Sequence, residues 1–251
     1  MDLDRNVFLE DFAHNSAALN LIFLNHLGAP GKLLAQASTI ELLADKFSTT
    51  AFIDYCRKHK LVKELVITQL YRTKNIVVKF KDESEIYFSL VSNMVRKTFL
   101  CLDVKAIRKS AFINEYGMLV PEKQYHFEYM ALKCQFNKDP LPERYSNYFA
   151  GLDINSRTII FKYIQTRYNL IFNKLEDLYN PKPNTLLTIL IGLRAEKSNT
   201  LFRMFLRSIE LVGYKGFGRF TKRGIHVSPS PVHELQLPAS GKKKPAGHAI
   251  F

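Results

Sequence analysis

Two short segments in which apolar side chains alternate strictly with other residues constrain this chain more than any other feature. In residues 75–80 and 85–91 one set of apolar side chains recurs at every second position, and the polar segment 81–84 separates the two. A period of two places successive side chains on opposite faces of a strand, and a short polar turn between two such segments is typical of an antiparallel hairpin. The sequence therefore predicts a β-hairpin within a small sheet.

Further strands and helices are expected on both sides of this hairpin. Strands are predicted over 39–44, 65–71 and 116–120. Helices are predicted over 7–28, after a Ser48-Thr49-Thr50 cap, and over 104–110, 122–137, 141–150, 154–177, 184–195 and 197–212. These elements predict an α+β fold, in which a small mixed β-sheet flanked by helices is followed by a helical C-terminal half.

The chain divides accordingly into an α/β region over 1–121, a helical region over 122–212 and a basic tail over 213–251. Residues 214–251 hold seven Lys or Arg and one Glu, together with four prolines. Like charges and prolines disfavour a packed structure, so we expect this tail to be disordered.

Composition and charge limit the classes of function. Apolar residues make up 47% of the chain, which excludes wholesale disorder, and 36 Lys or Arg against 23 Asp or Glu give a net charge of +13 that attracts polyanions. No apolar run approaches the ~20 residues that span a bilayer, and the first residues lack a secretory signal, so a cytoplasmic protein without a transmembrane segment is expected. Cys56, Cys101 and Cys134 lie too far apart for a zinc site of the usual spacing, and we expect them to be reduced and buried.

Three segments carry a resemblance to a known superfamily. They are Ala-Ser-Thr-Ile-Glu-Leu-Leu-Ala over 37–44, Glu-Ile-Tyr-Phe-Ser-Leu-Val over 85–91 and Tyr-Gly-Met-Leu-Val-Pro over 116–121. Their order resembles that of the nucleotidyltransferase-like superfamily, which has the catalytic fold of DNA polymerase β, and is most similar to its bacterial polysaccharide-cluster members. The resemblance is one of pattern with few identities, spread over residues 7–180.

The resemblance implies a two-metal chemistry and also shows that this chain lacks most of the carboxylates that the chemistry needs. Members of the superfamily hold two Mg²⁺ ions, about 3.5–4 Å apart, with an Asp-x-Asp pair on one strand and a third Asp on a neighbouring strand. Here the paired positions fall on Thr39 and Glu41 and the third on Ser89, which makes these the candidate catalytic residues and Glu41 the candidate metal ligand. One carboxylate cannot hold two divalent ions, so the chain is expected to use Mg²⁺ only if it is active, with weak or lost transfer activity.

Two groups of cations are candidates for ligand binding. The resemblance implies that Lys32, Arg96, Lys97 and Arg108 contact a nucleoside triphosphate or another phosphorylated ligand. A second, aromatic-rich group predicts binding to a polyanion and comprises Arg203, Arg207, Lys215, Arg219, Lys222 and Arg223. Such a mixture can stack on bases and contact phosphates, or lie on an anionic membrane surface.

Two functions therefore stay open. The first is a divergent, nucleotide- or phosphate-binding nucleotidyltransferase-like protein in surface-polysaccharide biosynthesis. The second is a non-catalytic module that binds nucleic acid or an anionic membrane.

Overall fold

The computed structural model describes residues 3–25, 39–70, 72–96, 99–137, 139–168, 172, 174–179, 201–218 and 225–227. The expected mixed α+β fold is confirmed. Its sheet has six strands in the order β1-β2-β5-β4-β3-β10. The strands are β1 (Ile22–Phe23), β2 (Ile40–Leu43), β3 (Val62–Leu70), β4 (Thr73–Phe80), β5 (Glu85–Val91) and β10 (Ile225–Val227).

The predicted hairpin is formed by β4 and β5, which pair antiparallel with Ile76 opposite Phe88. β2 and β5 pair in parallel, so both strands run toward the same end of the sheet. Beyond them, β1 pairs antiparallel with β2. An alternating burial pattern over residues 75–80 of β4 and 85–90 of β5 gives the sheet two distinct faces.

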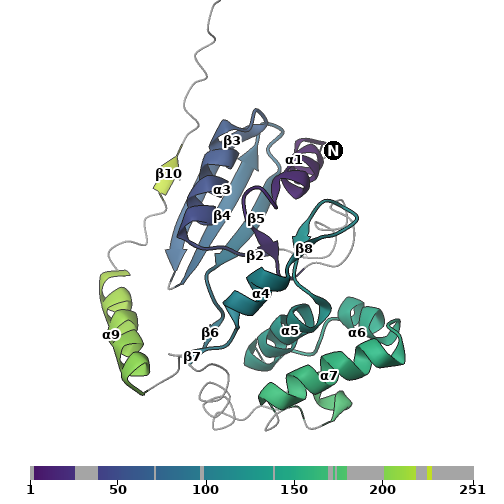
Figure 1. Cartoon of the computed structure of the whole chain (residues 1–251). Coiled ribbons are helices and arrows are strands. Elements are labelled where there is room, and N and C mark those ends of the chain that lie inside the picture. The colour runs from purple at the N-terminus through teal and green to yellow at the C-terminus, as the bar shows by residue number, and fades with distance from the viewer. Residues whose placement is uncertain are drawn as a thin grey trace, which may run out of the picture.

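One face of the sheet is covered by α1 (Leu3–Asn15) and α3 (Lys46–Lys58), as Figure 1 shows for α3. Phe88 lies at the centre of this layer, with its ring centroid 5.5 Å from that of Phe12 and 4.9 Å from that of Phe52. Tilted and edge-to-face rings at such distances pack favourably. Each of these fully buried phenyl groups contributes about 1.5–3 kcal/mol to folding, which explains why both helices dock here.

The helices of the C-terminal half are α4 (Val104–Ser110), α5 (Lys123–Asn137), α6 (Glu143–Ala150), α7 (Ile154–Tyr168), the 3-10 turn η1 (Leu175–Leu178) and α9 (Leu201–Gly218). Of these, α4 to α7 gather near β2 and share a core with residues of the other face of the sheet, whereas α9 lies apart from them (Figure 1). Two small hairpins precede α5, namely β6 (Val95–Arg96) with β7 (Phe99–Leu100), and β8 (Phe112–Ile113) with β9 (Leu119–Val120). Leu43 and Val91 of the sheet share one core with Phe127 and Ile164 of the helices. The boundary expected at residue 121 therefore does not separate two cores.

Several expected elements have different bounds. The first helix ends at Asn15 instead of residue 28, because Asn20 adopts a left-handed backbone (φ 53°) and the buried run after it forms β1. The cap of α3 is Asp45, whose carboxylate accepts a hydrogen bond of 2.8 Å from the backbone N–H of Ser48, and not the predicted Ser-Thr-Thr segment. The strand expected over 116–120 is reduced to β9, because Gly117 adopts a positive φ in a turn.

The C-terminal part also differs from expectation. The helix predicted over 154–177 ends at Tyr168 and is followed by η1, whereas the helix predicted over 184–195 lies outside the described residues. α9 begins at Leu201 and continues to Gly218, and β10 pairs antiparallel with β3. Parts of the segment expected to be disordered are therefore ordered, because backbone pairing with a sheet edge does not require an apolar sequence.

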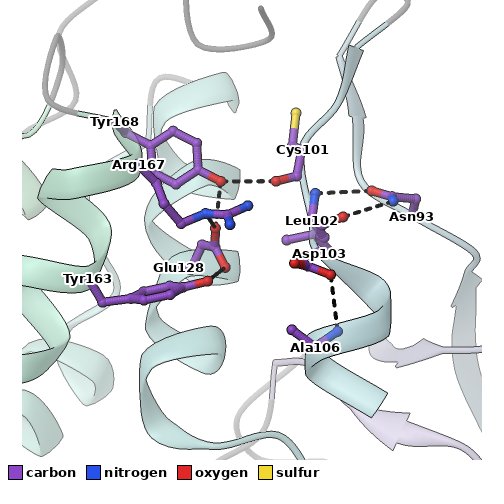
Figure 2. Close-up of polar contacts among 9 residues, drawn as sticks. All are labelled: Asn93, Cys101, Leu102, Asp103, Ala106, Glu128, Tyr163, Arg167 and Tyr168. Carbon is purple, nitrogen blue, oxygen red and sulfur yellow. Dashed lines mark hydrogen bonds and ion pairs between the residues drawn. The ribbon is translucent and has the colours of Figure 1, made fainter. Parts of the chain in front are cut away.

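A buried polar network joins the helices to the segment that leads into α4 (Figure 2). Glu128 of α5 is fully buried, and its Oε1 lies 2.9 Å from Nε of Arg167 of α7. The hydroxyl of Tyr163 donates to its Oε2 over 3.2 Å, and the hydroxyl of Tyr168 contacts Glu128 and lies 2.9 Å from the carbonyl oxygen of Cys101. A buried carboxylate requires such partners, so the network fixes α5 relative to α7.

Two further expectations concern the cysteines and the membrane. All three cysteines are buried and outside disulfides, as predicted. Among the helices that the structure describes, none combines the length and the apolarity needed to cross a membrane.

Candidate functional site

Four polar side chains form a row across the face of the sheet that is turned away from α1 and α3. Glu41 of β2 is the direct partner of Ser89 of β5, which is opposite Asn75 of β4, which in turn is opposite Thr68 of β3. Paired residues of neighbouring strands lie on the same face about 5 Å apart, so the four form a continuous polar row. The sequence-predicted pair, Glu41 and Ser89, is thus brought side by side.

The carboxylate of Glu41 is held by two residues of α5. Its Oε2 lies 2.8 Å from Nζ of Lys133, and its carboxylate also bonds the hydroxyl of Tyr129. Residues four apart share a face of a helix, so Tyr129 and Lys133 reach the same acid. Burial, and then the charge of Glu41, raises the pKa of Tyr129 well above its usual value, which keeps this hydroxyl a donor.

Asn25 fixes the backbone that carries Thr39 and Glu41. Its side-chain amide is buried, its Nδ2 donates to the carbonyl oxygen of Thr39, and its Oδ1 accepts from the backbone N–H of Glu41, each over 2.9 Å. The amide thereby adds side-chain hydrogen bonds to β2 beyond the last paired residues of β1 and β2, Phe23 and Leu42. This clamp sets where β2 begins and holds Glu41 in register with Ser89.

No family model, curated protein or solved structure matches this chain. The chemistry available here therefore rests on the side chains of the row, which are one carboxylate, two hydroxyls and an amide, and on the ammonium group of Lys133.

These side chains do not fit a pair of magnesium ions. Mg²⁺ requires oxygen ligands in near-octahedral geometry, usually including carboxylates. Glu41 is the only carboxylate of the row, and the Lys133 ammonium already occupies it at 2.8 Å. Within the part of the chain that the structure describes, no group of three His, Cys, Asp or Glu side chains could hold a metal ion. The row therefore disfavours two magnesium ions for two reasons: it has one carboxylate, and a cation from α5 already pairs with that carboxylate.

Of the four predicted phosphate contacts, Arg108 has a side chain that the structure describes. Lys32 and Lys97 lie outside the described residues, and Arg96 belongs to β6. Arg108 of α4 forms an ion pair with Asp45, its Nη2 3.5 Å from Oδ2, and Asp45 caps the helix on the other face of the sheet. Arg108 is therefore engaged beside α3.

A cavity of about 270 Å³ lies on that other face, between the first turn of α3 and the β3–β4 turn. Lys46, Arg72 and Lys74 supply the cations of its lining. Lys74 pairs with Leu90, a core residue of the face that α3 covers, so the cavity and the polar row lie on opposite sides of the sheet. The two locations provide separate places for a ligand, which substitutions can distinguish.

The cations predicted to bind a polyanion differ in exposure, and the structure describes only some of them. Arg203 is exposed on α9, whereas Arg207 is only 7% exposed and faces the protein, so it is not available to a flat polyanion surface. Lys215 lies in α9, and the remaining members, Arg219, Lys222 and Arg223, lie outside the described residues.

Sequence reasoning missed Asn25, Tyr129 and Lys133. One signal was present for Lys133: its neighbours on α5 over residues 126–132 and 134–136 are buried, and it is the one Lys or Arg in this largely apolar stretch. A cation in such a stretch needs an acidic partner. Which acid it meets depends on how α5 docks on the sheet, and the sequence does not contain that information locally.

Proposed function

We propose that this chain binds a phosphorylated ligand, such as a nucleoside phosphate, on a nucleotidyltransferase-like fold that has weak or lost two-metal transfer activity. The observation that carries the proposal is the 2.8 Å contact between Lys133 and Glu41, at the position to which the resemblance assigns a metal ligand. A fixed ammonium group supplies positive charge there without a bound ion. The acceptor expected from the resemblance, a surface-polysaccharide precursor, stays a prediction.

The geometry leaves Lys133 able to bind an anion. An ammonium group has three N–H donors, and Glu41 engages one of them through Oε2. The side chain is 34% exposed, so the remaining donors can reach a phosphate oxygen. Ser89 and Thr68 add hydroxyl donors along the same row. The net charge of +13 attracts such a ligand from solution.

Two substitutions at this contact separate metal-free binding from two-metal catalysis. We expect calorimetric titration with ATP and UTP to give the same affinity in EDTA and in Mg²⁺. Lys133→Gln removes a charge-assisted hydrogen bond and should weaken binding about tenfold. Glu41→Gln removes a competing acceptor and should leave affinity unchanged or increase it. In a two-metal enzyme Glu41→Gln would abolish Mg²⁺-dependent binding instead.

Lys74→Gln is the matched control, because Lys74 lies on the opposite face of the sheet. It should bind both nucleotides as the unaltered chain does. If Lys74→Gln weakens binding and Lys133→Gln does not, the ligand occupies the α3 cavity and our assignment of the site is wrong. If neither nucleotide binds with or without Mg²⁺, the proposed function fails.

A further inference from the structure

α9 exposes four large apolar side chains to solvent. Phe205, Leu206, Ile209 and Val212 are 61%, 43%, 54% and 69% exposed. Three of them, at positions 205, 209 and 212, follow the spacing of one helical face. This surface, which we call the α9 apolar face, is the densest group of exposed large apolar residues on any described helix. A soluble helix usually presents the opposite face to water, so the arrangement indicates a binding surface.

Polar contacts hold α9 in this orientation. Arg207, on the side opposite Phe205, is only 7% exposed. Glu210 forms an ion pair with Arg72 at the β3–β4 turn, with 3.5 Å between Oε2 of Glu210 and Nη2 of Arg72. The helix lies at the margin of the molecule in Figure 1. The protein therefore binds α9 through its polar side and leaves the apolar side outward.

The positive charge of the sequence from residue 213 onward indicates that the partner is anionic. Residues 213–251 contain seven Lys or Arg and one Glu, and four of the cations fall within 215–223. An apolar helical face next to a basic segment is the pair of signals that stable attachment to an anionic bilayer surface requires. Nucleic acid fits less well, because Leu206, Ile209 and Val212 have no ring to stack on a base.

We propose that the α9 apolar face inserts into the interface of a membrane that contains anionic lipids, to which the positive charge of the sequence over 213–251 attracts the protein. The helix lies on such a surface and does not cross it. The proposal is independent of nucleotide binding at Lys133. It predicts a peripheral protein whose attachment depends on both apolar contact and lipid charge.

Vesicle flotation of the full chain tests both requirements. Vesicles of phosphatidylcholine mixed with an equal part of phosphatidylglycerol should carry the protein to the top of the gradient, and vesicles of phosphatidylcholine alone should not. Each cation near an anionic surface contributes about fivefold, so raising the salt concentration should release the protein. The double substitution Phe205→Gln and Ile209→Gln should weaken binding at least about tenfold, because two apolar side chains no longer enter the interface.

The matched control is Ile159→Gln, which replaces an isoleucine of α7 that is 63% exposed, and it should float like the unaltered chain. Circular dichroism should show every variant folded, since the replaced side chains are exposed. Val212→Gln serves as a second, single substitution. Equal flotation with neutral and anionic vesicles would overturn the charge requirement, and unchanged flotation of the double variant would overturn the role of α9. A dimer in light scattering that the same double variant dissociates, without vesicle binding, would show the face to be a self-association surface and would refute the proposal.

Discussion

Replacing Arg167 with Met should destabilise the protein by an amount that increases with pH. Arg167 is the charged partner of the fully buried Glu128, at 2.9 Å. Breaking a buried ion pair by removing one partner typically costs about 3–5 kcal/mol. Because the Arg167 side chain is 22% exposed and partly screened, we expect the lower end, about 3 kcal/mol, at neutral pH.

The pH dependence follows from the pKa of Glu128. Burial raises this pKa above its value in the unfolded chain, and Arg167 opposes the increase. The folded state therefore binds a proton more tightly, and stability decreases as pH rises from the unfolded pKa to the folded pKa. Loss of Arg167 moves the folded pKa further upward and extends this interval.

The hydroxyl of Tyr168 also favours the protonated form of Glu128. It lies between two acceptors, the carboxylate of Glu128 and the carbonyl oxygen of Cys101, but has one proton to donate. If Glu128 is protonated it donates to Tyr168, and Tyr168 then donates to Cys101. Each donor therefore has an acceptor when the acid is neutral. Protonation should thus relieve most of the cost of losing Arg167 at low pH.

Urea denaturation followed by far-UV circular dichroism measures the effect, since the chain has no tryptophan. We expect Arg167→Met to lose about 3 kcal/mol at pH 7.5 and clearly less at pH 5. Glu128→Gln combined with Arg167→Met should be more stable at pH 7.5 than Arg167→Met alone, because no unpaired charge is left buried. A loss below about 1 kcal/mol, or an equal loss at both pH values, would refute the reasoning.

Two further predictions test local features of the fold. Gly117→Ala should cost more than about 1–2 kcal/mol in urea denaturation, because Gly117 has a φ of 77° and a Cβ would lie 2.6 Å from Nδ1 of His14. Gly151→Ala, at a φ of −75° and with ordinary contacts, should be neutral, and an equal loss in both would show the left-handed backbone to be irrelevant. Asp45→Ala should cost about 1 kcal/mol at neutral pH by removing the cap of α3. The hydrogen bond from Ser48 lowers the pKa of Asp45, so the loss relative to the unaltered chain should disappear as pH falls through that lowered pKa; a loss that persists in strong acid would contradict the cap.

Local pattern was sufficient to predict the hairpin and the chemistry of its two faces. The alternation along 75–80 and 85–91 is a property of neighbouring residues, and it specified β4 and β5 and the face on which Ser89 lies. The pairing of Glu41 with Ser89 was reached through the resemblance and matches the parallel register of β2 and β5. The bounds of α1 and the cap of α3 were harder to predict from the sequence, because several residues near each helix end can adopt the terminal conformation.

Tertiary structure alone decided which partners these residues meet. Lys133 could be expected to need an acid, but only the docking of α5 on the sheet assigns it to Glu41, 92 positions away in the chain. The outward orientation of the α9 apolar face likewise depends on the contacts of Arg72 and Arg207, and not on the periodicity of the helix itself. A helical period states which residues share a face. Which face is buried is set by the free energy of the whole assembly, to which long-range contacts contribute most.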